Sequence, residues 1–192
     1  MEYLIIALSS YLMGSIPFGF LLTKIFLKKD IRDIGSGNIG ATNALRTGNK
    51  SLGYTTLALD ITKAILPVLY VKFNFPDYIF ISSLSAFLGH VFPVWLKFKG
   101  GKGVATLFGG FLFINPYTAI LSIMTWVLMV KITKLSSLGA LVSIFILTIA
   151  NFIFIDGGLN KSLILILMII IYYKHKDNIK RLVNKSENKI DL

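Results

Sequence analysis

The sequence contains no cysteine and little charge, and each shortage narrows the class of protein that it can encode. Without cysteine, disulfide scaffolds, thiolate metal sites and a cysteine nucleophile are excluded. Charged residues make up 15% of the 192 residues, whereas globular proteins average about 25%. Apolar residues reach 55%. This balance excludes an ordinary soluble domain, and it excludes intrinsic disorder because disordered chains are poor in apolar residues.

Acidic residues are also scarce, with nine Asp and Glu against 20 Lys and Arg, so the formal charge is +11. Such an excess can indicate nucleic-acid binding. In a membrane protein, however, it arises from the preference of Lys and Arg for the cytoplasmic side. We therefore expect membrane lipids as partners and no nucleic acid.

The apolar residues form blocks close to the roughly 20 residues that a helix needs to cross a bilayer. The first block has no basic residue ahead of it and no cleavage site, so it predicts a retained helix rather than a signal peptide. The blocks indicate an all-α integral membrane protein, and they lie at residues 3–27, 54–73, 78–98 and 135–155, with a shorter run at 163–173.

The stretch 104–130 can be one long helix or two short crossings hinged at Asn115 and Pro116, a turn-forming pair. With two crossings and the N-terminus outside, 17 of the 20 Lys and Arg residues lie on the cytoplasmic side. With one crossing, eight of them move outside, so the positive-inside rule favours two. The sequence thus predicts about seven transmembrane helices, some short or kinked, with the N-terminus out and the C-terminus in. A re-entrant pair remains the alternative for 104–130.

In that topology the polar, glycine-rich segments 34–50, 98–106 and 174–189 all lie at the cytoplasmic face of a single membrane domain, residues 1–192. A protein with its loop chemistry on one side is better suited to act at that interface than to carry a solute across. The three segments are therefore the candidate functional motifs.

The first motif combines glycines, which turn backbone N–H groups inward at low steric cost, with neutral donors and Arg46, a planar cation suited to phosphate or carboxylate. The alternative is a tight turn followed by a helix capped by Thr42 or Asn43. The glycines and neutral donors are Gly35, Ser36, Gly37, Asn38, Gly40, Thr42 and Asn43.

The second motif is a glycine-rich turn at the start of a predicted helix, where unpaired N–H groups and the helix dipole favour an anion. Lys99 and Lys102 add positive charge. It is not a Walker A loop, because Gly103 follows Lys102 where that loop has Ser or Thr. The alternative is a basic turn that binds lipid head groups.

Polar residues elsewhere have plainer interpretations. His175 and Asn178 share one helical face in the third motif, although a lone histidine at a helix end is more often a surface residue. Asp60 and Lys63, three apart in a predicted span, are expected to compensate each other as a structural pair. His90 lies deep enough to need a partner, and Asp60 is the candidate.

Taken together, these segments resemble the PlsY-type acyl-phosphate:glycerol-3-phosphate acyltransferases of bacteria. The matching stretches are residues 35–43 with Arg46, residues 87–93 running into 98–106, and His175, Asn178 and Arg181 with Glu187 downstream. Three long motifs in the correct order, covering nearly the whole chain, are a specific signal. One departure is Lys185, where the family often has glycine.

The resemblance implies transfer of a fatty acyl group from acyl phosphate to the 1-hydroxyl of sn-glycerol 3-phosphate, the first acylation of phospholipid synthesis. The products would be 1-acylglycerol 3-phosphate (lysophosphatidate) and phosphate. It implies no cofactor or metal, and neither acyl carrier protein nor CoA as direct donor. It places the protein in the cell (inner, cytoplasmic) membrane as a multi-pass enzyme with its active site at the cytoplasmic face.

The resemblance also assigns roles to residues. It makes Glu187 structural, as the residues themselves already suggest for Asp60, Lys63 and His90. Catalytic roles fall to Ser36, Asn38, Arg46, Lys102, His175 and Asn178. The substrate phosphates would be bound by Gly37, Gly40, Thr42, Asn43, Gly100, Gly101, Gly103 and Thr106.

Two mechanisms are open for the proton of the attacking hydroxyl. The phosphate of the acyl phosphate can accept it, because the leaving group of a mixed anhydride is good and its oxygens lie near the hydroxyl. Alternatively, His175 acts as general base, since an unperturbed histidine pKa of about 6.5 suits neutral pH. The first is favoured.

Two other functions compete with the enzyme. A small anion transporter would use Asp60, Lys63 and His90 as a midplane site, although the sequence shows no internal repeat. A non-enzymatic scaffold would bind anionic lipid through the basic tail. Phosphate release that depends on glycerol 3-phosphate distinguishes the enzyme from both.

Overall fold

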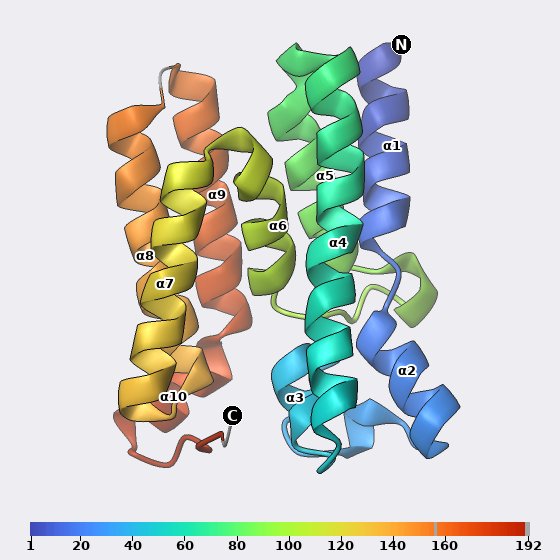
Figure 1. The fold of residues 1–192 in the computed structure, drawn as a ribbon, viewed down its shortest axis with the longest axis vertical. Coiled ribbons are helices and arrows are strands. Elements are labelled where there is room, and N and C mark those ends of the chain that lie inside the picture. Colours follow the sequence, from blue (N-terminus) through green and yellow to red (C-terminus); the bar gives the residue numbers. More distant parts are fainter. Residues whose placement is uncertain (156, 191–192) are drawn as a thin grey trace. The chain divides into compact units, whose positions relative to one another are not determined.

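The computed structural model describes residues 1–155 and 157–190, and all regular structure in these ranges is helical (Figure 1). Packing divides the chain into two compact units, residues 1–114 and residues 115–192. The helices of the first unit are α1 (Glu2–Gly14), α2 (Phe18–Leu27), α3 (Ala41–Leu45), α4 (Lys50–Asn74), α5 (Ile79–Val91) and α6 (Val104–Ile114), with 3₁₀ turns η1 (Ile31–Asp33), η2 (Pro76–Tyr78) and η3 (Val94–Leu96). The helices of the second unit are α7 (Pro116–Thr133), α8 (Ser136–Phe154), α9 (Gly158–Lys174) and α10 (Lys176–Val183).

The first apolar block is two helices rather than one continuous helix. Helix α1 ends at Gly14 and α2 begins at Phe18. Pro17 explains the interruption, because proline has no N–H to donate and its ring clashes with the preceding turn of a helix. The sequence predicted one retained helix over this block, and the structure breaks it in two.

Small residues let α1 and α5 pack closely in the first unit. A Cβ at Gly14 would overlap the backbone of Ala86, and one at Gly89 would overlap the backbone of α1. One turn before the Gly14 contact on both helices, the hydroxyls of Ser10 and Ser82 are hydrogen-bonded at 2.9 Å. Close backbone approach and buried hydroxyl pairs are typical of helix packing within membranes.

Helix α6 is short, and its neighbours in the first unit hold it at both faces. Its 11 residues span about 16 Å, roughly half of a bilayer core. Gly109 lies against the backbone of α4, and Gly110 lies against Ser83 of α5. The Lys72 ammonium donates to the carbonyl oxygen of Phe113 at 2.8 Å, which satisfies one of the unpaired carbonyls at the end of the helix.

The predicted interruption at Asn115 and Pro116 is confirmed. Asn115 is the N-cap of α7, its side-chain oxygen accepts from the N–H of Thr118 at 3.4 Å, and Pro116 is the first helical residue. In the second unit, hydrogen bonds join the helices: the Thr118 hydroxyl donates to Asn151 of α8 at 3.1 Å, and the Tyr172 hydroxyl donates to the carbonyl of Leu141 at 3.0 Å.

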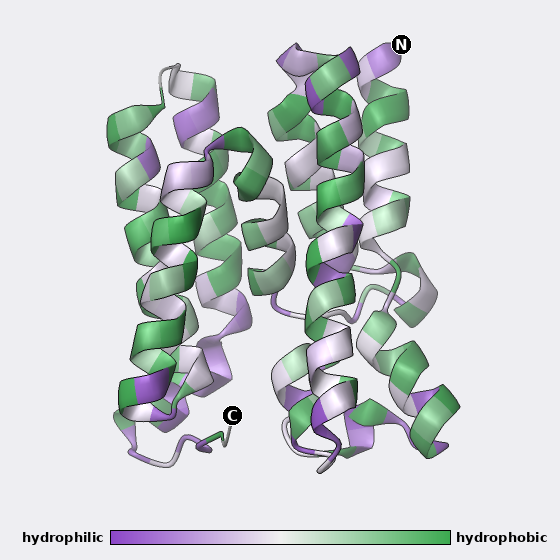
Figure 2. Cartoon of the chain, in the orientation of Figure 1, coloured by the Kyte–Doolittle hydropathy of each residue, from purple (hydrophilic) through white to green (hydrophobic). Residues whose placement is uncertain are grey.

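The helices confirm the all-α membrane fold. Four segments of the described residues are long and apolar enough to span a bilayer: Glu2–Leu27, Pro76–Leu96, Pro116–Thr133 and Ser136–Phe154. Hydrophobic residues line the helices along their lengths, whereas hydrophilic residues concentrate around α3 and in α10 (Figure 2). The count of seven crossings, their orientation and the single domain over 1–192 stay predictions.

Candidate functional site

The first motif directly follows η1 in the segment between α2 and α4, and it contains α3. Gly35 and Gly37 have φ angles of +55° and +70°, a left-handed conformation that glycine adopts at little cost. Gly40 is the N-cap of α3, so the alternative that placed the cap at Thr42 or Asn43 is wrong.

Asn43 organises this loop from its centre. Its side chain is 1% exposed. Its Oδ1 accepts the N–H of Ser36 at 2.9 Å. Its Nδ2 donates to three loop carbonyls, those of Ile31, Ile34 and Asn38, at 3.0, 2.8 and 2.8 Å. The amide therefore ties both ends of the glycine turn together.

The other polar side chains of the motif are more accessible. Ser36 is exposed, whereas Asn38, Thr42 and Arg46 are half-buried. The Oδ1 of Asn38 accepts from the N–H of Ile39 at 3.0 Å. The stem of Arg46 lies beside Gly35, because a Cβ added there would stand 3.1 Å from Arg46 Cδ. The aliphatic part of Arg46 thus packs against the left-handed turn.

The second motif leads from η3 into α6, and its first glycines are fixed to the end of α5. The N–H of Gly100 donates to the carbonyl of Val91 at 3.2 Å, and that of Gly101 donates to the carbonyl of His90 at 3.0 Å. The expectation of unpaired N–H groups is therefore wrong at these two glycines. Donors for an anion must come from later in the loop.

The remainder of this motif forms the start of α6. Gly103 has a φ angle of +87°, and its Cα lies so close to the Phe87 ring that a Cβ would overlap it. The Thr106 hydroxyl is buried and donates to the Gly103 carbonyl at 2.9 Å. Lys102 is half-buried within the loop. The first N–H groups of a helix lack intrahelical acceptors, so the first turn of α6 supplies donors at this point.

The two loops rest on a common hydrophobic cluster in the first unit. Leu96 of η3, which precedes the second motif, packs in one cluster with residues that flank and enter the first motif. Half-buried side chains of α2, including Phe20, cover it. The other buried members of the cluster are Ile31, Ile39, Ala44 and Leu52.

Asp60, Lys63 and His90 form a buried polar cluster in the same unit. The Lys63 ammonium lies 2.8 Å from Asp60 Oδ1, as the spacing of three predicted, and the side chains are 2% and 3% exposed. His90 Nδ1 lies 3.7 Å from the same oxygen. Lys63 also donates to the carbonyl of Ile16 at 2.7 Å, within the break between α1 and α2.

The third motif lies in the second unit. His175 joins α9 to α10 and is 3% exposed. Its Nδ1 lies 2.8 Å from the Ile171 carbonyl, which can only accept, so this contact places a proton on Nδ1. In the neutral ring Nε2 is then the basic nitrogen. Asn178, one turn later, is also buried.

Glu187 fastens the C-terminal segment to α8 and α10. Its carboxylate accepts from Ser137 at 3.0 Å, from Asn178 at 2.8 Å and from Arg181 Nε at 2.7 Å. Burial disfavours its charged form, but the hydrogen bonds from these three donors outweigh burial. The pKa of Glu187 therefore lies below its usual value.

Lys185, the departure from the family pattern, keeps the turn that glycine would make. Its φ angle is +55°. The N–H of Ser186 donates to the carbonyl of Arg181 at 2.8 Å, and that of Lys185 donates to the carbonyl of Leu182 at 3.1 Å. This is the Schellman pattern that ends helices with a left-handed residue.

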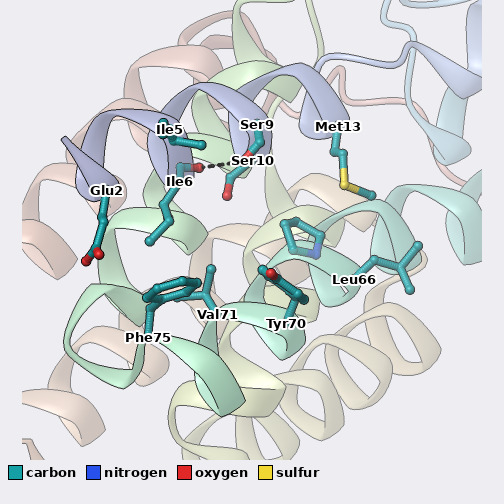
Figure 3. Close-up of a pocket in the computed structure, with 11 residues that line it drawn as sticks. Glu2, Ile5, Ile6, Ser9, Ser10, Met13, Leu66, Tyr70, Val71 and Phe75 are labelled. Atoms are coloured by element: carbon teal, nitrogen blue, oxygen red, sulfur yellow. Dashed lines mark hydrogen bonds between the residues drawn. The ribbon is translucent and has the colours of Figure 1, made fainter.

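An apolar groove of about 390 Å³ lies between α1 and α4 (Figure 3). Ile6, Met13, Leu66 and Phe75 are among its lining residues, and Glu2 is its charged member. It lies along the C-terminal half of α4, whereas the first motif precedes the N-terminus of that helix. The groove suits an alkyl chain rather than a phosphate. In the described ranges, no three His, Asp or Glu side chains gather as metal ligands.

Solved structures with this helical fold exist. One is PlsY, an integral membrane glycerol 3-phosphate acyltransferase, in its glycerol 3-phosphate form, with a TM-score of 0.94 and 30% sequence identity over 100% of this chain and 96% of that one. Its lysophosphatidic acid form matches with a TM-score of 0.90 at the same identity and coverage. The fold is therefore that of an integral membrane acyltransferase.

The sequence comparisons identify the family. The model described as glycerol-3-phosphate acyltransferase matches residues 4–185. The protein of that name from Pelagibacter ubique (strain HTCC1062) is 65% identical over 192 residues, which is 100% of both chains. The one from Bartonella henselae is 48% identical over 191 residues, covering 97% of this chain and 90% of the relative. The chain belongs to the glycerol-3-phosphate acyltransferase family, which confirms the resemblance.

Sequence reasoning overlooked two features of the site. It grouped Asn43 with the phosphate ligands, although this amide is engaged with the loop backbone. It also missed that His90 contacts the second glycine loop through Gly101. The sequence did hold one signal of this contact. His90 lies at the end of a helix only ten residues before the glycine loop, and a short turn between them can fold the loop back onto the helix end.

Proposed function

We propose that this protein transfers a fatty acyl group from acyl phosphate to the 1-hydroxyl of sn-glycerol 3-phosphate. The hydroxyl oxygen attacks the acyl carbonyl carbon, the bond from that carbon to the phosphate oxygen breaks, and 1-acylglycerol 3-phosphate and inorganic phosphate are released. Family membership supports the transfer to glycerol 3-phosphate, and the solved relative was captured with glycerol 3-phosphate and with lysophosphatidic acid.

The observation that carries this proposal is the pair of glycine loops in the first unit, which share one hydrophobic support and each bear a cation. A reaction between two phosphorylated reactants needs two anion sites. Arg46 supplies the cation of the first loop and Lys102 that of the second. Positioned cations and dipoles are the largest usual contribution to acyl transfer, because they stabilise charge that develops in the transition state.

The second motif is proposed to hold the phosphate of glycerol 3-phosphate. Lys102 and the first N–H groups of α6, at Val104 and Ala105, are the donors in this proposal. Gly100 and Gly101 shape the loop and do not bind the phosphate in this proposal, because their own N–H groups bond to carbonyls of α5. The buried Thr106 hydroxyl holds the backbone at Gly103.

The first motif is proposed to bind the phosphate of the acyl donor and the oxyanion that develops from its carbonyl. Arg46, Ser36, Asn38 and Thr42 have accessible or half-buried side chains that suit this role. Asn43 shapes the loop from inside instead, because its oxygen and nitrogen already bond to four backbone groups. Gly37 and Gly40 set the backbone path.

His175 and Asn178 are proposed to orient the glycerol hydroxyl. The contact of Nδ1 with the Ile171 carbonyl fixes the orientation of the His175 ring in this proposal. We assign the final proton transfer to the donor phosphate, whose oxygens adjoin the attacking hydroxyl. The His175→Ala variant should then lose part of its turnover and keep its pH dependence. A near-total loss of turnover, with the pH dependence near neutrality gone, would make His175 the general base.

The proposed setting is the cytoplasmic face of the inner membrane, with seven crossings and the N-terminus outside. Single cysteines introduced into this cysteine-free chain at Lys50, Lys99 and Lys189 should react with an impermeant maleimide only when the cytoplasmic side is exposed. Labelling of these positions from opposite sides would contradict the topology.

The decisive experiment uses purified protein with acyl phosphate and glycerol 3-phosphate. We expect phosphate release that depends on glycerol 3-phosphate, and no product with acyl-CoA or acyl carrier protein as donor. The Lys102→Ala variant should lose activity, whereas the Lys99→Ala variant, which removes an exposed lysine three residues earlier, should keep it. Equal activity from acyl-CoA would overturn the donor assignment, and no phosphate release would overturn the function.

A further inference from the structure

The buried cluster of Asp60, Lys63 and His90 lies directly behind the glycine loop of the second motif. We propose that His90, oriented by Asp60, is a positioning residue that sets the path of this loop and thereby its affinity for glycerol 3-phosphate. The inference rests on the proposed function, in which that loop holds the phosphate of glycerol 3-phosphate.

The first observation is the contact between the His90 ring and the loop. A Cβ at Gly101 would overlap His90 Nε2, so the loop backbone lies directly against the edge of the ring. The Gly101 N–H donates to the His90 carbonyl at 3.0 Å, and the Gly100 N–H donates to the next carbonyl, that of Val91, at 3.2 Å. Ring and backbone of one residue therefore hold the loop at adjacent points.

The second observation is that the opposite side of the ring faces the buried carboxylate of Asp60. His90 Nδ1 lies 3.7 Å from Asp60 Oδ1, and both side chains are nearly inaccessible, at 4% and 3%. Asp60 is in turn 2.8 Å from the Lys63 ammonium. Lys63 donates to the Ile16 carbonyl and lies 5.7 Å from the centre of the Phe18 ring. The break between α1 and α2 thus fixes Lys63, which orients Asp60 and through it His90.

The third observation is the energetic cost of the arrangement. Burying ionisable side chains carries a large desolvation penalty, and a buried ion pair is often no more stabilising than an apolar replacement of similar volume. In a membrane, ionisable residues within helices are functional candidates for that reason. Stability alone does not explain this cluster, whereas fixing a loop that must hold an anion does.

A positioning role makes a specific kinetic prediction. In the His90→Ala variant the loop loses its support, so KM for glycerol 3-phosphate should rise by about tenfold to a hundredfold, the upper figure being the loss that a displacement of about 1 Å can cause. KM for acyl phosphate should stay within about twofold, because the first motif binds that substrate in the proposed function. Asp60→Asn should also raise KM for glycerol 3-phosphate.

The contact between His90 and Gly101 gives a sharper test. Gly101→Ala in the wild-type background places a methyl group against the ring and should impair glycerol 3-phosphate binding. In the His90→Ala background the ring is absent, so the same substitution should cost much less. The two effects should be non-additive, as they are for residues in direct contact.

Ser83→Ala is the matched control, because Ser83 is a buried polar residue of the same helix that faces α6 rather than the loop. It should leave both KM values unchanged. If His90→Ala does not fold, His90→Asn, which retains a donor near the Nδ1 position, is measured by equilibrium binding of glycerol 3-phosphate and by apparent Tm.

The outcomes distinguish a positioning role of His90 from a purely structural one. A raised KM for glycerol 3-phosphate with an unchanged Tm supports the positioning role. A lowered Tm with wild-type KM, or strictly additive effects of His90→Ala and Gly101→Ala, would show that His90 is only structural. Failure of the proposed function is seen separately, because the wild-type protein would then release no phosphate in response to glycerol 3-phosphate.

Discussion

Replacing Lys185 with glycine should stabilise the protein, because Lys185 holds a backbone conformation that glycine adopts more easily. Its φ angle is +55° where α10 ends, and the bond from the Ser186 N–H to the Arg181 carbonyl depends on that angle. The Lys185 side chain is exposed, so its removal disturbs little packing. The substitution therefore changes mainly the backbone energy.

The magnitude follows from two opposing effects. A left-handed conformation costs an L-residue about 1–2 kcal/mol. Glycine avoids this cost but loses about 0.5–1 kcal/mol more conformational entropy on folding than alanine does. A net stabilisation of roughly 1 kcal/mol remains, which corresponds to a rise in Tm of about 2–4 °C for a chain of this size.

The assay is thermal unfolding in one detergent at one scan rate, followed by circular dichroism. Lys185→Ala is the matched control, since it removes the same charge and keeps a Cβ in the left-handed conformation. It should show no gain in Tm. An increase of the same size in both variants would assign the effect to charge and refute the backbone explanation.

Three further predictions follow. Glu187 has a lowered pKa, so its contribution to stability is complete above its ordinary pKa of 4.5 and is lost as the pH falls through the native value. Between pH 7 and pH 3 the apparent Tm of Glu187→Gln should therefore fall less than that of the wild type, and parallel profiles would contradict this. Asn43→Asp should lower the free energy of unfolding by about 2–4 kcal/mol, because three carbonyls lose their donor, and denaturant titration measures it. Gly103→Ala should raise KM for glycerol 3-phosphate by about tenfold or more. Gly48→Ala should leave this KM unchanged, although Gly48 also has a positive φ, +85°, because an added Cβ would meet nothing within 4 Å. An equal rise in KM in both variants would mean that backbone strain alone causes it.

Features set by local chemistry could be predicted from the sequence. The interruption at Asn115 and Pro116 follows from a cap and a proline in the first helical turn, and the structure has it there. The pairing of Asp60 with Lys63 follows from a spacing of three on one helix. In each case the relevant atoms are close in the chain, so no knowledge of the tertiary path was needed.

Features that depend on the path of the chain could not be predicted. Lys63 binds the carbonyl of Ile16, 47 residues away, and only the break at Pro17 makes that carbonyl available. Asn43 is a typical anion ligand by residue type, yet the fold places three backbone carbonyls around its nitrogen. The residue type determines what a side chain can bind, and the tertiary fold determines which of these partners lie within reach.

The glycines of the two motifs illustrate the same distinction. Gly35 and Gly37 provide left-handed turns, Gly100 and Gly101 allow close contact with α5, and Gly103 does both. Gly100 and Gly101 have their own N–H groups engaged by α5. A glycine-rich segment is therefore not an anion site through glycine N–H groups as such. Its glycines bend the chain, and in the proposed function the binding energy comes from Lys102, Arg46 and the first turn of α6.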